Sequence, residues 1–203
     1  MSQILDLILS LEWELFDQVR NIGVRANCQD DRTTFFLMRS SQLSAWSEEM
    51  RRSYLDDLYL ARAEGRNPLA EKYGYMMEYT DPAGYARIKD SLPPRSPEKL
   101  ALIARICTAH SEWNRVMHER YPHLSGRGRA VDKSSDSLNT TSFDTYLAGE
   151  LATYSLETLT FYWTHVSELQ TRGENMNELI LKNTVTQYGY PSLSAAETAI
   201  AGT

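Results

Sequence analysis

The sequence is poor in cysteine, carries no net positive charge and has no long apolar run. Its 203 residues include 2 cysteines, and the formal net charge is −6 with a pI of about 5.3. Cys28 and Cys107 are too few for a disulfide framework, and two thiols in a chain without a targeting signal usually stay reduced. The acidic balance argues against a nucleic acid as partner. No segment approaches the roughly 18 consecutive apolar residues of a membrane span, so we expect no membrane partner either.

An export signal is also lacking. The first residues, Met1, Ser2 and Gln3, have neither the basic start nor the small-residue cleavage site of a signal peptide. A chain of this length buries roughly 70% of its unfolded surface when it folds, so its core needs no disulfide or metal. We therefore expect a cytoplasmic, globular protein whose residues 1–203 form a single domain.

Motifs of common cofactor sites are absent from the sequence. There is no Gly-x-Ser-x-Gly elbow, no dinucleotide-binding glycine pattern and no zinc-ribbon cysteine pair. The histidines form no His-x-x-x-His or Glu-x-x-His pair, which are the spacings that helical metal centres use. These histidines are His110, His118, His123 and His165. The sequence predicts no cofactor and no metal.

Apolar residues recur every three or four positions along most of the chain, which is the period of an α-helix. No segment shows the alternation of a strand, so we expect an all-α helical bundle. The clearest break is the proline-rich segment 91–97, and residues 124–141 predict a long polar loop. The expected helices cover residues 4–22, 34–64, 69–79, 82–90, 97–121, 142–172, 175–188 and 192–201.

The chain matches itself when it is shifted by 108 residues, which predicts an internal duplication. Two similar halves, about 1–92 and 96–191, would pack about a pseudo-twofold axis, with corresponding residues facing each other. The pair Glu12-Trp13 before the first long helix would correspond to Glu112-Trp113 before the second. The alternative is that helix–loop–helix units resemble one another through amphipathic patterning alone. The identical residues are Thr33, Phe35, Leu43, Ser47, Glu49, Tyr54, Gly65 and Asn67, which fall on Thr141, Phe143, Leu151, Ser155, Glu157, Tyr162, Gly173 and Asn175.

Polar residues stand on apolar helix faces in both halves. Glu12 shares a face with Ile8 and Leu15. A buried carboxylate must find a cation or shift its pKa, and the cations available nearby are Arg20, Arg25, Arg39 and Arg129. We expect a polar pocket on the pseudo-axis, or, as the alternative, a purely structural network of ion pairs. The pocket would be lined by Glu12, Gln42, Glu112 and Glu150, with Arg25 and Arg129 over its mouth and Trp13, Trp46, Trp113 and Tyr154 as its walls.

Several short motifs resemble those of an uncharacterised family of bacteria and some fungi, the domain-of-unknown-function family four-one-two-five. The motifs extend over nearly the whole chain. The resemblance implies one intact, all-helical domain and brings no activity with it. The motifs are Leu11-Glu12-Trp13-Glu14, Cys28-Gln29-Asp30-Asp31, Arg39-Ser40-Ser41-Gln42, Glu71-Lys72-Tyr73, Gly149-Glu150-Leu151 and Tyr154-Ser155.

These observations favour a small-molecule enzyme that works without a metal. Glu12 and Glu150 would act as general acid and base, and Arg25 or Arg129 would hold an anionic group of the substrate. Chemistry of this kind includes cyclisation, elimination, isomerisation and hydration. The remaining substrate-binding candidates are Gln42, Trp46, Glu112, Trp113 and Tyr154.

Two other functions stay open at this point. One is a non-catalytic interaction or regulatory protein that forms a homodimer through the aromatic segment 73–79. The other is an oxidase with a carboxylate-bound metal, because three of the four polar positions in the expected pocket are carboxylates.

Overall fold

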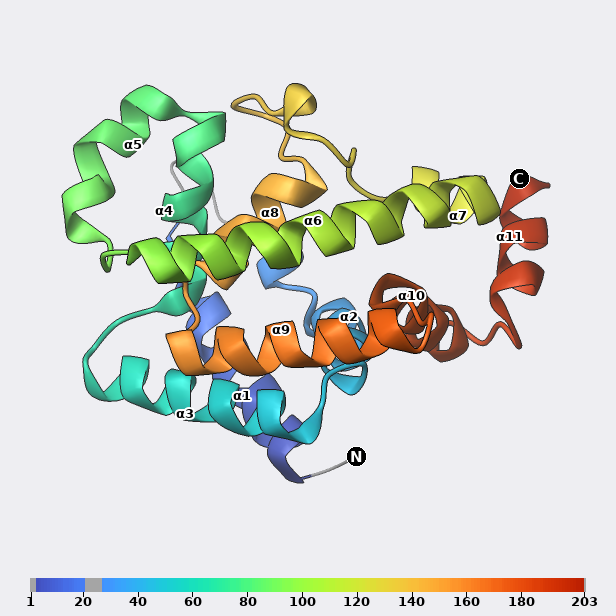
Figure 1. Cartoon of the computed structure of the whole chain (residues 1–203), viewed down its shortest axis with the longest axis horizontal. Coiled ribbons are helices and arrows are strands. Elements are labelled where there is room, and N and C mark those ends of the chain that lie inside the picture. The colour runs from blue at the N-terminus through green and yellow to red at the C-terminus, as the bar shows by residue number, and fades with distance from the viewer. Residues whose placement is uncertain (1–2, 21–26, 203) are drawn as a thin grey trace.

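The computed structural model describes residues 3–20 and 27–202, and these residues fold into helices without a β-strand (Figure 1). The predicted fold class, all-α, is confirmed. The α-helices of the described residues are α1 (Gln3–Asp17), α2 (Arg32–Ser44), α3 (Glu48–Ala63), α4 (Pro68–Thr80), α5 (Pro82–Ile88), α6 (Pro97–Arg120), α7 (Pro122–Gly126), α8 (Phe143–Leu151), α9 (Leu156–Thr171), α10 (Met176–Gln187) and α11 (Leu193–Ala201). Three short 3-10 turns, η1 (Asn27–Gln29), η2 (Lys89–Ser91) and η3 (Lys133–Ser135), accompany them.

Two helices, α1 and α6, organise the packing. Helix α1 contacts α2, α3 and α4, while α6 contacts α8, α9 and α10. The two sets are joined by α4 on α8, by α10 on α2 and by α3 on α9. Figure 1 shows the long α6 crossing the molecule beside α9, with α11 at the far end, where it contacts α7 and α10. The centre of the molecule is therefore surrounded by helices from both ends of the sequence.

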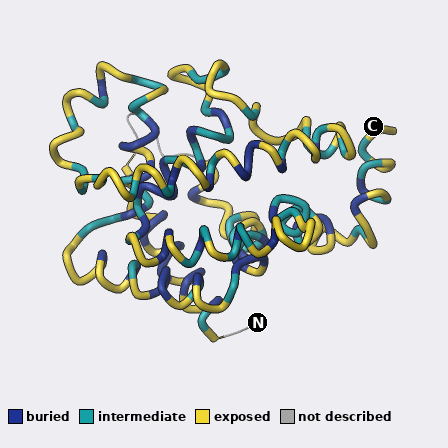
Figure 2. Tube along the Cα trace, in the orientation of Figure 1, coloured by how far each residue is buried: buried dark blue, intermediate teal, exposed yellow. Residues whose placement is uncertain are grey.

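The main core lies where these helices meet, and Figure 2 shows the buried residues concentrated there. Its fully buried members come from α1, α2, α3, α6, α8, α9 and α10; among them are Ile8, Leu43, Met50, Ile106, Leu151, Leu159 and Met176. A smaller cluster of Val185, Leu193 and Ala196 fastens α11 to α10. In the described part of the chain, no helix has both the length and the apolar character that crossing a membrane requires.

Two predicted helices are each divided in two by a serine. We expected continuous helices over 34–64 and 142–172, but the first divides into α2 and α3 and the second into α8 and α9. Ser47 starts α3, because its hydroxyl accepts a hydrogen bond from the amide of Met50 at 3.2 Å. Ser155 starts α9 in the same way, with the amide of Thr158 at 3.1 Å. Apolar periodicity runs through both breaks, so it cannot reveal a cap that restarts the helix on a new axis.

The predicted Gly-x-Asn turns are both present and have the same construction. Gly65 and Gly173 follow α3 and α9 with φ of 67° and 68°, a left-handed conformation that glycine adopts without strain. Asn67 then caps α4 and also donates to the carbonyl of Leu15 at 2.8 Å. Asn175 caps α10 and donates to the carbonyl of Trp113 at 3.2 Å. Each turn thereby ties a helix start to α1 or to α6.

Other predicted boundaries need smaller corrections. Helix α1 ends at Asp17 rather than near residue 22, although Val19 beyond it is still buried. The expected loop over 124–141 begins inside α7. The loop is also held in place, since Asp136 accepts hydrogen bonds from the Ser142 amide at 2.6 Å and the Thr145 hydroxyl at 2.5 Å.

The aromatic segment 73–79, expected to offer a surface for a second copy, is partly committed to the core. Tyr75 and Met76 are buried, and the Tyr75 hydroxyl donates to the carbonyl of Pro93 at 2.6 Å. Tyr73 and Tyr79 are exposed. The homodimer stays a prediction, with a smaller apolar surface than the sequence suggested.

Candidate functional site

Four charged side chains meet in the interior, and we call them the ion cluster. Glu12 comes from α1, Arg39 from α2, Lys72 from α4 and Glu150 from α8. Glu12, Lys72 and Glu150 are only 1%, 8% and 5% exposed. Because two carboxylates face two cations, the ion cluster is electrically neutral, which is the condition for keeping charges in a protein interior.

Arg39 bridges the two carboxylates. Its Nε donates to Oε2 of Glu12 at 2.7 Å, and its Nη2 donates to the other carboxylate oxygen of Glu12. Its Nη1 donates to Oε1 of Glu150 at 2.9 Å and to the amide oxygen of Gln42 at 2.6 Å. The planar guanidinium suits this arrangement, since its N–H groups point in fixed directions that match a carboxylate.

Four side chains of the described residues donate to the carboxylate of Glu150. Lys72 Nζ donates to its Oε2 at 2.9 Å. The Tyr154 hydroxyl and the Gln42 amide donate to its Oε1 at 2.8 Å and 3.2 Å, and Arg39 supplies the fourth bond. Lys72 also lies 3.5 Å from the centre of the Tyr146 ring, a cation–π contact.

The electrostatic environment keeps Glu150, Arg39 and Lys72 of the ion cluster ionised. Burial by itself would raise the pKa of Glu150, but Lys72 and Arg39 lower it, and the net pKa lies well below the ordinary value of a glutamate. Burial would lower the pKa of Arg39 and of Lys72, but the facing carboxylates raise both pKa values above their ordinary ones. The pKa of Tyr54 is also raised, first by burial and then by Glu12, so its hydroxyl keeps its proton and donates it to Glu12 Oε1 at 2.6 Å.

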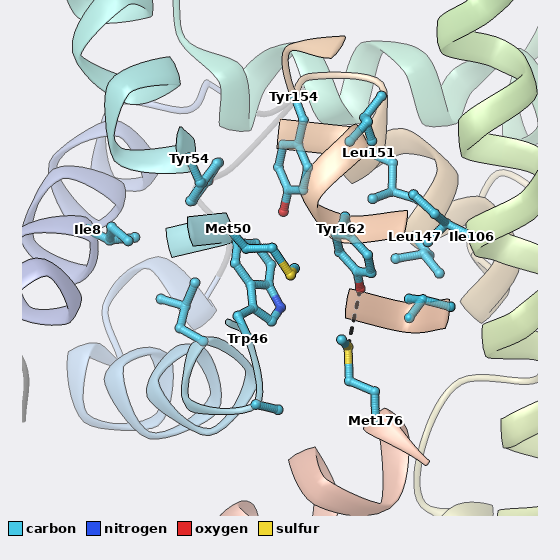
Figure 3. Packing of buried hydrophobic residues seen from close by; sticks show 14 of the residues in the cluster. Ile8, Trp46, Met50, Tyr54, Ile106, Leu147, Leu151, Tyr154, Tyr162 and Met176 are labelled. Carbon is cyan, nitrogen blue, oxygen red and sulfur yellow. Dashed lines mark hydrogen bonds between the residues drawn. The ribbon is translucent and has the colours of Figure 1, made fainter. Parts of the chain in front are cut away.

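An aromatic layer of Trp46, Tyr54, Tyr154 and Tyr162 lies next to the ion cluster, and Figure 3 shows these four rings together. The ring of Trp46 lies edge to face with those of Tyr54, Tyr154 and Tyr162, with centroids 5.5, 5.9 and 5.6 Å apart. Two of these tyrosines donate to the carboxylates, Tyr54 to Glu12 and Tyr154 to Glu150. The layer therefore fixes where the tyrosine hydroxyls, and through them the carboxylates, are held.

A cavity of about 300 Å³ opens beside the ion cluster, and we call it the cluster hollow. All four charged residues of the ion cluster contribute to its wall, together with Tyr54. The apolar wall residues are Phe16, Phe35, Met38, Pro68, Leu69, Tyr73 and Tyr146. Exposed residues at its edge include Cys28, Asp31 and Arg129, and the Arg129 guanidinium lies 4.5 Å from the centre of the Tyr146 ring.

A second cavity, also of about 300 Å³, lies on the other side of Glu150, and we call it the histidine hollow. Its polar wall residues include His110, Tyr162 and Asn177, from α6, α9 and α10. The two hollows share the residues Met38, Arg129, Tyr146 and Glu150.

Most of the predicted site residues are brought together. Glu12, Glu150 and Gln42 lie in or against the ion cluster, Arg129 lies at the edge of both hollows, and Tyr154 binds Glu150. Trp46 is buried behind the ion cluster, where it supports the tyrosines rather than lining a hollow.

Four other predicted residues remain, and one of them, Trp13, lines neither hollow but packs against Phe35 with ring centroids 5.2 Å apart. Glu112 is exposed on α6 and contributes to neither hollow, so the prediction that it lines the pocket is wrong. The reason is helical phase, since its neighbour Ser111 is buried and Glu112 faces away from the core. Trp113 is buried against the ring of His110, with centroids 5.2 Å apart, and lines neither hollow. Arg25 lies outside the residues that the structure describes.

The sequence analysis missed two members of the site. Lys72 stands out in the sequence only as part of a family motif, and its burial against Tyr146 of α8 depends on which helices meet. Arg39 was considered as one of several cations without being chosen. The spacing could have predicted Arg39 as a member of the site, because Arg39 precedes Gln42 by three positions and so lies on the same face of the helix.

A metal would have to compete with these cations. Within the described residues, no group of three or more His, Cys, Asp or Glu side chains has the arrangement of a metal site. The space between Glu12 and Glu150 is filled by the guanidinium of Arg39, which binds both. The carboxylates that the oxidase alternative needs as ligands are thus already bound to cations.

Comparison with known proteins places the chain in a family without assigning it an activity. Residues 2–198 match the family described as "Protein of unknown function (DUF4125)", which agrees with the resemblance of the sequence motifs. No curated protein matches the chain, and no solved structure matches it.

Proposed function

Because the chain belongs to the DUF4125 family, described only as of unknown function, we propose its activity from the site itself: a small-molecule enzyme that works in the cluster hollow by metal-free acid–base chemistry. The observation that carries this proposal is that the ion cluster forms part of the wall of a cavity. A network that only held the helices together would not need an open space beside four charged groups and a tyrosine hydroxyl.

The wall of the cluster hollow suits a substrate with an apolar body and a polar, anionic group. The apolar side chains of Phe35, Leu69 and Tyr73 would contact the body. Arg129 offers a cation at the exposed edge, and Lys72 offers one inside. A mainly apolar wall with a few oriented polar groups is typical of small-molecule sites.

Of the two predicted acid–base groups, we keep Glu12 for proton transfer and give Glu150 a positioning role. The pKa of Glu150 is so far below its ordinary value that its carboxylate is a poor proton acceptor near neutral pH. Its role in this proposal is to hold Lys72 and Arg39 in the wall. Glu12 would take a proton from one substrate atom and return it at another, as an isomerisation requires. The Tyr54 hydroxyl, whose proton is donated to Glu12 Oε1, would orient this carboxylate, and the Lys72 ammonium would stabilise a developing oxyanion.

The proposal predicts a selective loss of turnover when Tyr54 is changed to phenylalanine. The purified chain would be incubated with a fractionated extract of bacterial metabolites, and consumed or isomerised compounds would be identified by mass spectrometry. For the substrate found, Tyr54→Phe is expected to lower kcat about 10²-fold, because Glu12 loses the hydrogen bond that orients its carboxylate. The chosen readout is the rate of product formation at saturating substrate.

Tyr59→Phe is the matched control. It is the same substitution on the same helix, at a residue that is 45% exposed, and its turnover should equal that of the unchanged protein. Undiminished turnover in Tyr54→Phe, or an extract from which nothing is bound or consumed, would contradict the proposal.

We further infer that the two halves of the chain arose by duplication and pack about a pseudo-twofold axis. Corresponding residues meet at the centre, since Gln42 donates to Glu150 at 3.2 Å and the rings of Trp46 and Tyr154 lie 5.9 Å apart. The packing is also reciprocal, because α4 lies on α8 of the other half while α10 lies on α2. Corresponding residues line the two hollows, among them Tyr54 and Tyr162, Phe35 and Phe143, and Leu69 and Asn177.

The correspondence between α1 and α6 differs from the one expected. Asn67 and Asn175 bind the carbonyls of Leu15 and Trp113, which relates these helices by a shift of 98 residues. Glu12 therefore corresponds to His110, and the alignment of Glu12-Trp13 with Glu112-Trp113 is two residues out of phase. In a crystal structure, superposing α1 to α4 on α6, α8, α9 and α10 is expected to need a rotation of about 180°. A rotation far from this angle would contradict the symmetry.

A further inference from the structure

The histidine hollow contains a chain of three hydrogen-bonded side chains whose direction can be worked out. Asn177 Nδ2 donates to the carbonyl of His110 at 3.0 Å and to Oδ1 of Asn114 at 2.8 Å. This fixes which end of the Asn177 amide is oxygen, and that oxygen lies 2.6 Å from Nδ1 of His110. Nδ1 must therefore carry the hydrogen, because an amide oxygen can only accept.

The tautomer of His110 decides what Tyr162 offers to a ligand. With the hydrogen on Nδ1, the other ring nitrogen is an acceptor, and the Tyr162 hydroxyl donates to it at 2.9 Å. Among the described residues, the one other acceptor in contact is the sulfur of Met176 at 3.7 Å, a longer and weaker bond (Figure 3). The proton of Tyr162 is thus committed to His110, and within the described residues no group donates to the tyrosine oxygen. The Tyr162 oxygen can therefore still accept a hydrogen bond, but it has no proton left to donate.

Most of the hollow's wall is apolar, and its charged members are Glu150 and, at the exposed edge, Arg129. Where the cluster hollow has Arg39 and Lys72, the corresponding positions of the histidine hollow hold Leu147 and Ile180. The other apolar wall residues are Met38, Met117, Leu124, Phe143 and Leu181. The shared Glu150 already has its charge compensated by Lys72 and Arg39. Since Arg129 is exposed at the edge, an ionic group beside the buried Tyr162 would lose its water next to no counter-charge that is not already paired.

We propose that the histidine hollow is a second binding site, for a neutral and mainly apolar small molecule with one hydroxyl or N–H group that donates to the oxygen of Tyr162. The volume of about 300 Å³ accommodates a molecule of one or two rings. His110 and Asn177 act as positioning residues, since they hold the tyrosine proton away from the ligand. This site is independent of the acid–base activity proposed for the cluster hollow.

The test uses phenol as the probe and toluene as its matched partner without the hydroxyl. Binding to the full chain would be followed by NMR of the methionine methyl groups. Met117 lines the histidine hollow, Met38 lines both hollows, and Met50 is buried in the core as an internal control. Phenol is expected to shift the Met117 signal, leave Met50 unchanged, and bind about threefold to tenfold more tightly than toluene, as one added hydrogen bond allows.

Tyr162→Phe separates the hydrogen bond from the shape of the hollow. In this variant the affinity for phenol is expected to fall to that for toluene, while toluene still binds, which shows that the hollow itself is intact. Tyr188→Phe, at a residue that is 57% exposed, should change neither affinity. Equal affinities for phenol and toluene in the unchanged protein, a phenol affinity unaffected by Tyr162→Phe, or shifts confined to Met38 would each overturn the proposal.

Discussion

Replacement of Arg39 by methionine is expected to lower the free energy of unfolding by about 3–5 kcal/mol, the cost of leaving buried carboxylates without their cation. Arg39 is the one residue that binds both Glu12 and Glu150 among the described contacts, and its side chain is only 14% exposed. Methionine fills a similar space but supplies no donor, so the loss is electrostatic rather than a loss of packing. Urea unfolding followed by circular dichroism would measure it.

Arg52→Met provides the control for the same substitution. Arg52 also pairs with a glutamate, Glu48 at 2.7 Å, but both side chains are more than 60% exposed, and pairs of this kind contribute little to stability. The unfolding midpoint of this variant should stay unchanged. If Arg39→Met were as stable as Arg52→Met, the ion cluster would not hold the helices together as described.

The effects of substitutions within the ion cluster on the free energy of unfolding should also be coupled. Lys72→Met and Glu150→Gln each remove one charge from a neutral group of four, whereas the double substitution restores the balance of charge. The double variant is expected to lose less stability than the sum of the single ones, by about 1–3 kcal/mol. Strict additivity of the two losses would show that Lys72 and Glu150 act separately, despite the 2.9 Å bond between them.

Acidification from pH 6.5 to pH 5 is expected to destabilise the protein by about 2 kcal/mol through His110 alone. Burial lowers the pKa of His110 from 6.5 to about 4, although the hydrogen bond with Asn177 offsets part of that shift. Between these two pKa values the unfolded chain binds a proton that the folded chain does not. Stability therefore falls as the pH falls, and this loss levels off below about pH 4.

The contribution of His110 can be separated from that of the carboxylates. Glu150, whose folded pKa is depressed, keeps its stabilising effect above the unfolded value of 4.5 and loses it only at lower pH. The window from pH 6.5 to pH 5 therefore reports mainly on histidine. His110→Gln should flatten the stability curve there, whatever its stability at pH 7, and ring signals of His110 in the unchanged protein should titrate near pH 4. If the His110 ring titrates near pH 6.5, burial does not lower its pKa and the prediction fails.

The sequence by itself determined the helices and the turns between them. Apolar periodicity located the helical segments, and the Gly-x-Asn pattern located two turns, because a left-handed glycine and a capping asparagine act within a few residues. It also identified Glu12, Gln42 and Glu150 as polar residues on buried faces, since a carboxylate on an apolar stripe is visible from spacing alone.

The tertiary structure decided which partners those polar residues meet. Spacing cannot choose among four nearby arginines, and it gives no reason to bring Lys72 of α4 against Glu150 of α8, 78 positions away. Spacing also left the buried face of α6 undecided, which is why Glu112 was expected in the pocket although it is exposed. Local signals depend on a few neighbouring residues, whereas the pairing of charges depends on which helix faces pack together, and that is set by the whole core.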